Sequence, residues 1–202
     1  MNVLLLIDIQ NDFLPPDGKL AVPDGDQVIA VANAAIESAL HVVATQDWHP
    51  PDHGSFASQH AGVQLYQPFK LEGLDQTAWP DHCVQGTPGA EFAGALHTEK
   101  IDHVSRKGTD PMIDSYSGFF DNGHRKATDL HAYLQSVGAT ELTVMGLATD
   151  YCVKFTVLDA LGLGYPTRVV LDGCRGVNLN PGDVDRAIDE MKQAGATFGR
   201  LT

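Results

Sequence analysis

Short apolar runs alternate with helical stretches along this chain, and polar residues stand where the apolar runs end. An unbroken aliphatic run is typical of a parallel strand buried on both faces, because helices cover both sides of such a sheet. We predict strands at residues 3–7, 41–45, 102–106, 141–147, 167–171 and 197–198. We predict helices at residues 28–40 and 126–136, in the segment that starts at Ala148-Thr149-Asp150, and after Asn180-Pro181.

Strands that alternate with helices predict a parallel sheet between two helical layers. The fold class we expect is α/β, a three-layer α/β/α sandwich with a six-stranded parallel sheet in the order 3-2-1-4-5-6. The length of 202 residues fits one domain, residues 1–202. Residues 50–100 interrupt the alternation as a long loop excursion, whose aromatic residues indicate that it is ordered.

The predicted strand order brings several polar residues to one edge of the sheet. It places the carboxyl ends of the first and fourth strands side by side, where open α/β sheets bind their ligands. Asp8 follows the first strand, Cys152 lies in the first turn after the fourth, and Lys107 follows the third. Asp47 and His49 follow the second strand. We therefore expect these five side chains to face one functional site.

The charge of the chain excludes two classes of partner. Thirteen basic residues stand against 26 acidic ones, for a net charge of −13. Such a chain repels phosphate backbones and anionic membrane surfaces, so we expect no nucleic acid and no membrane among its partners. Small-molecule substrates remain, and the sequence leaves open whether the protein is a monomer or a homo-oligomer.

Hydropathy and cysteine usage indicate the cytoplasm. No apolar run approaches membrane-spanning length, and the N-terminal run lacks a basic leader and reaches Asp8 too early for a signal peptide. Cys83, Cys152 and Cys174 are odd in number and widely spaced, which is typical of free thiols in a reducing compartment.

Cys152 is the candidate nucleophile. At the start of a helix, a thiol meets unpaired backbone N–H groups and the positive end of the helix dipole, and both favour the reactive thiolate. Taken alone, a cysteine after a buried strand is more often a small core residue. The residues around it therefore decide whether it is a candidate nucleophile. Asp8 is suited to accept and return a proton, and Lys107 is suited to hold and tune Asp8. Together the three form a nucleophile, a base and an orienting cation.

A second group of residues suits a metal ion. Asp47 and His49 are two positions apart, which on an extended chain puts both on one side, and His82 in the long excursion can supply a third ligand. One carboxylate and two imidazoles suit one divalent zinc, iron or manganese ion, with positions open for water or substrate. The alternative is that these are surface loop histidines, which is how we interpret His53 and His60.

Three aromatic residues lie in loops at the same edge of the sheet. Loop aromatics more often pack the loop down than line a pocket. Three on one rim would nevertheless suit a flat ring held by stacking, and they are Phe13, Trp79 and Tyr116.

Five motifs cover nearly the whole chain: DIQNDF (8–13), TQDWHP (45–50), WPDHCVQGTPGAEF (79–92), RKGTDP with DSYSGF (106–119) and GLATDYCVKFTVLDA (146–160). In order and spacing they resemble the isochorismatase-like cysteine hydrolase family, in its nicotinamidase (pyrazinamidase) branch. Their joint occurrence is far more specific than any one of them. The resemblance implies the six-stranded α/β/α fold and hydrolysis of nicotinamide to nicotinate and ammonia in NAD salvage, with pyrazinamide as a plausible further substrate.

The resemblance also implies a role for each candidate residue. Cys152 attacks the amide carbonyl, Asp8 takes the thiol proton and delivers it to the leaving ammonia, and Lys107 holds Asp8. The oxyanion is met by the backbone N–H groups of Ala148 and Cys152, and the Leu147-Ala148 peptide is expected to be cis. A thioester forms and water cleaves it.

The family's metal ligands match Asp47, His49 and His82, and the metal is expected to hold the pyridine nitrogen. The ring would then lie between Phe13, Trp79 and Tyr116. Some relatives add a fourth protein ligand from the loop between the second and third. The residues available for it here are His53, Ser55 and His60, and the sequence does not choose among them.

Other functions stay open on the sequence alone. Related amidases that act on ureido or carbamoyl substrates share the Asp, Lys and Cys but generally lack the Asp-x-His motif found at Asp47 and His49. An isochorismatase proper lacks the cysteine. From another class, a non-catalytic nucleotide-binding module would carry GxGxxG after the first strand, where this chain has Asp8-Ile9-Gln10-Asn11.

Overall fold

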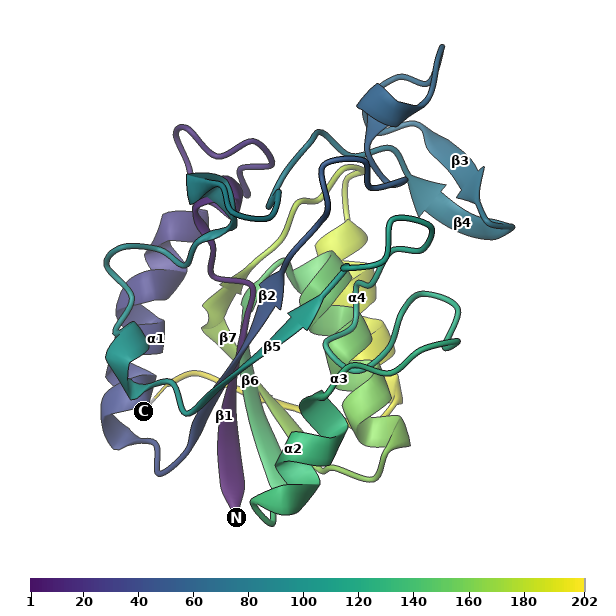
Figure 1. Ribbon diagram of the computed structural model, residues 1–202. Helices are drawn as coiled ribbons and strands as arrows, with labels where there is room; N and C mark the ends of the chain where they lie inside the picture. The colour runs from purple at the N-terminus through teal and green to yellow at the C-terminus, as the bar shows by residue number, and fades with distance from the viewer. Residues whose placement is uncertain (202) are drawn as a thin grey trace.

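A six-stranded parallel sheet forms the centre of the computed structural model, which describes residues 1–201 (Figure 1). Its strands are β1 (Asn2–Ile7), β2 (Val42–Asp47), β5 (His103–Lys107), β6 (Glu141–Leu147), β7 (Thr167–Arg175) and β8 (Thr197–Gly199). Their order across the sheet is β5-β2-β1-β6-β7-β8, and every neighbouring pair is parallel. Counted along the chain within this sheet, that order is 3-2-1-4-5-6, so the predicted fold class is confirmed.

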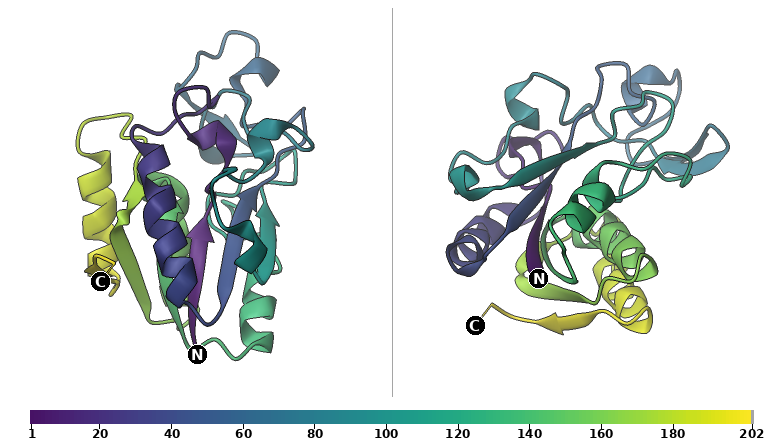
Figure 2. Two further views of the ribbon diagram at one scale, coloured as in Figure 1. Left: turned by 90° about the vertical axis from the view of Figure 1, so that its left-hand side faces the viewer. Right: turned by 60° about the horizontal axis from the view of Figure 1, so that its bottom comes forward.

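Helices cover both faces of the sheet. They are α1 (Val28–Ser38), α2 (Leu130–Ser136), α3 (Lys154–Gly162) and α4 (Asp183–Gln193). Helix α1 lies on one face, and α2, α3 and α4 lie on the other (Figures 1 and 2). Single turns of 3-10 helix lie at Asn11–Phe13, Gly25–Gln27, Ala57–Gln59, Pro88–Ala90 and Thr98–Lys100. No helix within residues 1–201 is long and apolar enough to cross a membrane.

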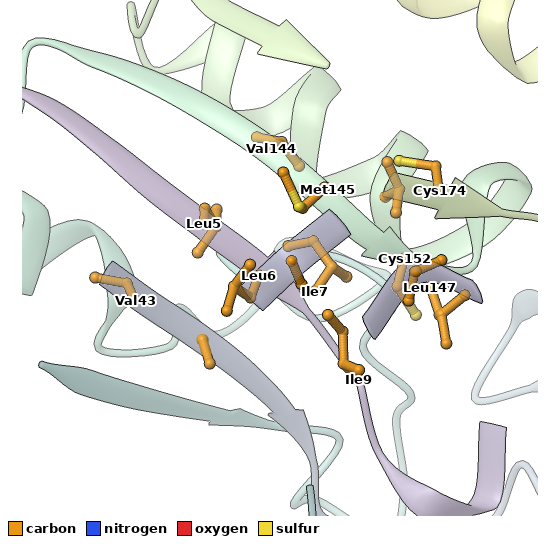
Figure 3. Close-up of a cluster of buried hydrophobic side chains, with 14 of the residues drawn as sticks. Leu5, Leu6, Ile7, Ile9, Val43, Val144, Met145, Leu147, Cys152 and Cys174 are labelled. Atoms are coloured by element: carbon orange, nitrogen blue, oxygen red, sulfur yellow. The ribbon is translucent and has the colours of Figure 1, made fainter. Parts of the chain in front are cut away.

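The buried core centres on β1, which lies in the middle of the sheet. Its residues from Val3 to Ile7 are at most 4% exposed, because side chains of both faces meet a helical layer. Figure 3 shows Leu5, Leu6 and Ile7 beside Val43 of β2 and residues of β6. The carboxyl ends of these central strands lead into the loops that carry the candidate site.

The long excursion contains a hairpin that the sequence did not predict. Strands β3 (Pro68–Leu71) and β4 (Leu74–Thr77) pair antiparallel as a separate two-stranded sheet, which is why the sheet labels are not consecutive. Their turn places Glu72 at φ 48° and Gly73 at φ 83°. Glu-Gly is a weaker hairpin signal than Asn-Gly or Asp-Gly, so the sequence did not predict a turn here.

Several element boundaries differ from the prediction. Strand β2 runs to Asp47 and β7 to Arg175, beyond the apolar runs that marked them. Helix α2 begins at Leu130 rather than at residue 126, because Thr128 is bonded through its backbone and hydroxyl to Phe119 and Gly118. These hydrogen bonds hold the segment before α2 extended.

Candidate active site

The predicted nucleophile, base and cation lie in contact at the carboxyl edge of the sheet. Asp8 follows β1, Lys107 ends β5, and Cys152 lies in a π-helical turn, Thr149–Val153, between β6 and α3. Lys107 Nζ is 2.9 Å from Asp8 Oδ2 and 3.4 Å from Cys152 Sγ. The side chains of Asp8 and Lys107 are fully buried, and Cys152 is 7% exposed. The convergence expected from the strand order is therefore present.

The backbone between β6 and α3 is unusual and carries Cys152 to Asp8. Gly146 has φ 130°, and a Cβ there would lie 2.1 Å from the Ile7 carbonyl oxygen, so only glycine allows this approach of β6 to β1. The Leu147-Ala148 peptide is cis, as expected. The N–H groups of Tyr151 and Val153 both donate to the Ala148 carbonyl, which forms the turn that holds Cys152.

Lys107 is the electrostatic centre of the site. Its ammonium donates to Asp47 Oδ1 at 2.7 Å and to the Ser115 carbonyl at 3.0 Å, besides its ion pair with Asp8. Burial by itself lowers the pKa of Lys107, but the carboxylates of Asp47 and Asp8 outweigh burial and raise it well above its ordinary value. Lys107 is therefore a permanent cation.

Asp8 is a stronger base than an ordinary aspartate. Burial raises the pKa of Asp8, and the Lys107 ammonium opposes this effect without cancelling it. Thr45 Oγ1 donates to Asp8 Oδ1 at 2.6 Å, while Lys107 pairs with the other oxygen. Both carboxylate oxygens are thus held in place.

Burial opposes the thiolate that the start of the helix was expected to favour at Cys152. Burial raises the pKa of Cys152 well above that of a free thiol, although the Lys107 ammonium acts in the opposite direction. The carboxylates of Asp8 and Asp47 raise this pKa further, so the thiol keeps its proton. A base must therefore remove the proton. Asp8 is near enough to do so, since a carboxylate oxygen of Asp8 lies within 4.8 Å of Cys152 Sγ.

Asp47, His49 and His82 converge as predicted for a metal site. Asp47 Oδ2 is 3.3 Å from His49 Nε2 and 3.7 Å from His82 Nε2. Ligand atoms about 2.1 Å from one tetrahedral metal ion lie about 3.4 Å apart, so this spacing fits. All three residues are buried.

The hydrogen bonds of the two imidazoles also fit a metal. His49 Nδ1 is 2.8 Å from the Gly108 carbonyl, and His82 Nδ1 is 2.8 Å from the Pro80 carbonyl. A carbonyl only accepts, so each Nδ1 carries the proton and each Nε2 lone pair faces the Asp47 carboxylate. Such a set is suited to hold a cation. Burial opposes a proton on His49, yet Asp47 still raises its pKa.

Of the three residues considered for a fourth ligand, His53 and Ser55 lie beside His49 and His60 does not. His60 Nε2 is 2.7 Å from the Gly54 carbonyl and lies away from the site. His53 and Ser55 are fully buried and bonded to each other at 2.7 Å, and the His53 ring is 4.2 Å from that of His49. Burial lowers the pKa of His53 to about 4, so it is neutral. The expectation of an exposed His53 was wrong.

Sequence reasoning missed two residues that hold the metal-ligand segments. Gln10 Nε2 donates to the Asp47 carbonyl at 2.8 Å, and Gln10 Oε1 accepts the Asp47 N–H at 2.8 Å. Asp12 Oδ2 accepts the N–H of Cys83, next to His82, at 2.7 Å. The polar residues at every second position of DIQND were the available signal.

The three predicted aromatic residues line one cavity together with Cys152 and the metal-ligand set. Trp79 Nε1 donates to the Tyr116 hydroxyl at 3.1 Å, and their rings are 87° apart. Tyr151, which the sequence did not single out, packs on Trp79 with ring centroids 4.8 Å apart. The cavity is lined by Phe13, Leu20, Asp47, His49, Trp79, His82, Asp114, Tyr116, Ala148, Tyr151, Cys152 and Val177.

The chain is similar to several known proteins over nearly its whole length. A nicotinamidase of Escherichia coli is 57% identical over 202 residues, covering 98% of this chain and 94% of its own. The structure of an Acinetobacter baumanii nicotinamidase and pyrazinamidase has a TM-score of 0.95 at 41% identity, over 98% of this chain and 95% of that one.

A pyrazinamidase of Pyrococcus horikoshii, solved in complex with zinc, has a TM-score of 0.80 at 36% identity, over 99% of both chains. The model of the isochorismatase domain matches residues 2–201. The chain therefore belongs to the isochorismatase-like hydrolase family, as its motifs predicted.

Proposed function

We propose that this chain is a nicotinamidase that hydrolyses nicotinamide to nicotinate and ammonia in NAD salvage, and that it also hydrolyses pyrazinamide. One observation carries the proposal. A single aromatic cavity is bounded by Cys152 at one side and by the Asp47, His49 and His82 set at another. The first group suits attack on a carboxamide, and the second suits a ring nitrogen. The names of the relatives from Escherichia coli and Acinetobacter baumanii support it.

The proposed reaction uses Asp8 as a proton shuttle. Asp8 takes the proton of the Cys152 thiol as sulfur attacks the amide carbonyl, and the N–H groups of Ala148 and Cys152 stabilise the oxyanion. The C–N bond then breaks, ammonia leaves with the proton from Asp8, and a thioester remains. Water, deprotonated by Asp8, cleaves the thioester, which releases nicotinate and restores the thiol.

Asp47, His49 and His82 would hold one divalent ion, of zinc, iron or manganese. When bound, the ion supplies a Lewis acid for the pyridine nitrogen. The ring would lie between Phe13, Trp79 and Tyr116, with its carboxamide toward Cys152. These residues select the substrate by orienting a flat heteroaromatic ring, because all of them line the same cavity.

A comparison of three amides tests this function against its alternative. We expect the metal-loaded protein to hydrolyse nicotinamide with a specificity constant kcat/KM at least about 100-fold above that of benzamide, which lacks the ring nitrogen. N-Carbamoylsarcosine represents the ureido and carbamoyl amidases and is expected to be a poor substrate. Faster turnover of N-carbamoylsarcosine than of nicotinamide would instead establish the alternative.

Thr45→Val is expected to lower kcat about 10- to 100-fold with little change in KM, because the Asp8 carboxylate loses the donor that orients it. Thr45→Ser keeps the hydroxyl and should restore most of kcat. Thr167→Val, at a buried threonine on β7 outside the cavity, is the control and should retain wild-type rates. Steady-state kinetics measure all three, and an unchanged kcat in Thr45→Val would remove the positioning role.

Gln10→Leu is expected to weaken metal binding about 10- to 100-fold, because Asp47 loses both hydrogen bonds that fix its backbone. Gln46→Leu is the matched control. Like Gln10, Gln46 is buried and donates to the Ala90 carbonyl. Its side-chain oxygen, however, accepts from Arg106 and not from Asp47. Competition with a chromogenic chelator measures the metal affinity, and equal losses in both variants would contradict a specific role of Gln10.

We further infer that residues 1–202 act as one domain in the cytoplasm, with small molecules as partners. Cys83, Cys152 and Cys174 are free and buried, which supports a reducing compartment.

A further inference from the structure

Buried side chains make up most of the wall of the cavity that Cys152 lines. Of the residues that line it, all are buried except Tyr116, Tyr151 and Val177, which are half-buried. These three side chains are therefore the part of the cavity wall that reaches solvent.

An open groove lies directly outside this part of the wall. It runs between the β3–β4 hairpin and the helices α3 and α4, and its walls include Thr77, Lys154 and Arg186. Tyr116 and Tyr151 line both the groove and the cavity. The rings of these two tyrosines, with centroids 5.3 Å apart, thus form the partition between solvent and the nucleophile.

The two tyrosines are held differently. The Tyr116 hydroxyl accepts hydrogen bonds from Gln76 Nε2 and Trp79 Nε1, both at 3.1 Å, and its ring stacks on Phe155. Tyr116 is thereby a fixed wall. Tyr151 packs edge-on against Trp79, directly precedes Cys152 in the π-helical turn, and lines the cavity on the side of the groove.

We propose that substrate enters from this groove and that Tyr151 is the specificity-determining residue, excluding pyridine carboxamides whose ring carries a substituent on the groove side. The proposal rests on the proposed function only for the identity of the ring. A smaller residue at position 151 joins the cavity to the groove and gives such a substituent room.

The first test measures entry to Cys152 without any catalytic step. Purified wild type, Tyr151→Ala and Tyr151→Phe are alkylated with N-methylmaleimide and with N-phenylmaleimide, and modification of the Cys152 peptide is followed by mass spectrometry. Both reagents alkylate the thiol by the same reaction and differ in size. The ratio of their rates is therefore independent of thiol reactivity and reports the size of the opening. We expect Tyr151→Ala to raise the ratio of the N-phenylmaleimide rate to the N-methylmaleimide rate at least about tenfold. Tyr151→Phe should leave this ratio unchanged.

Tyr66→Ala is the matched control. Tyr66 also packs edge-on against Trp79, at 6.1 Å, but it does not line the cavity. A general loosening of the Trp79 wall would raise the ratio in both alanine variants and would overturn the proposal, as would an unchanged ratio in Tyr151→Ala. If Tyr151→Ala does not fold, Tyr151→Leu is read by the same criteria.

The second test measures specificity. Nicotinamides with one methyl or ethyl group at the 4-, 5- or 6-position are compared with nicotinamide itself. We expect Tyr151→Ala to raise the kcat/KM of at least one of them, relative to nicotinamide, at least about tenfold over wild type and over Tyr66→Ala. No gain at any position overturns the proposal. If wild type does not hydrolyse nicotinamide, the proposed function has failed, and the alkylation ratio still decides the route of entry.

Discussion

Replacing Cys152 with alanine should abolish ammonia release from nicotinamide, lowering kcat by at least about 10⁴-fold, while nicotinamide still binds. In the proposed reaction the sulfur makes the bond to the substrate carbonyl, so no other group can take over its step. The proposed ring contacts of Phe13, Trp79 and Tyr116 should remain, since these residues line the cavity independently of the sulfur. Ammonia release measures the loss, and calorimetric titration with nicotinamide measures the retained binding.

Cys174→Ala is the control for this experiment. Cys174 is also a buried free thiol, but it lies on β7 and does not line the cavity. It should keep wild-type kcat within about threefold. Ammonia release that survives in Cys152→Ala would remove the nucleophile assignment, and loss in both variants would point to damage of the fold.

Removal of the metal should lower kcat/KM at least about 100-fold, and restoring a divalent ion should return it. Without the ion, the Nε2 lone pairs of His49 and His82 face the Asp47 carboxylate with nothing to bind them together. A second readout does not depend on activity. At a concentration 1,000 times its Kd, the ion adds about 4 kcal/mol of stability and should raise the Tm of stripped protein by about 8–16 °C.

His60→Ala is the control for metal binding, because His60 is bonded to the Gly54 carbonyl outside the ligand set. It should show the same rise in Tm on metal addition as wild type, and His82→Ala should show a much smaller one. Stripped protein that keeps full activity in the presence of chelator would contradict the metal's role.

Much of the fold could be predicted because its strands are unbroken aliphatic runs. Val3 to Ile7 marks the central strand, and the alternation with helices then determines the parallel order. The hairpin at residues 68–77 could not be predicted in the same way. Its strands are mostly exposed or half-buried, so no apolar pattern marks them, and a Glu-Gly turn is a weak signal.

The candidate site was predictable where a residue's position follows from a strand end. Asp8, Lys107 and Cys152 are of this kind, and each lies within contact of the others. The ionisation of Cys152 was not predictable, because its pKa depends on burial by loops that come from distant parts of the chain. The place of Tyr151 in the cavity wall was not predictable for a similar reason, because its exposure depends on the neighbouring hairpin and helices.

Supporting contacts were the hardest part to predict. Gln10 and Thr45 act through side-chain hydrogen bonds to Asp47 and Asp8, each 37 positions away in the sequence. Polar residues near strand ends are common, and their partners become visible only when the strands are brought side by side. Sequence alone therefore predicts the reacting groups better than the groups that hold them.

The central claim is that this chain hydrolyses a pyridine carboxamide with Cys152. The most direct measurement is the release of ammonia and nicotinate from nicotinamide by purified, metal-loaded protein, with both products quantified over time. We expect one ammonia for each nicotinate in wild type and neither product in Cys152→Ala. Absence of both products with fully metal-loaded wild type would contradict the claim.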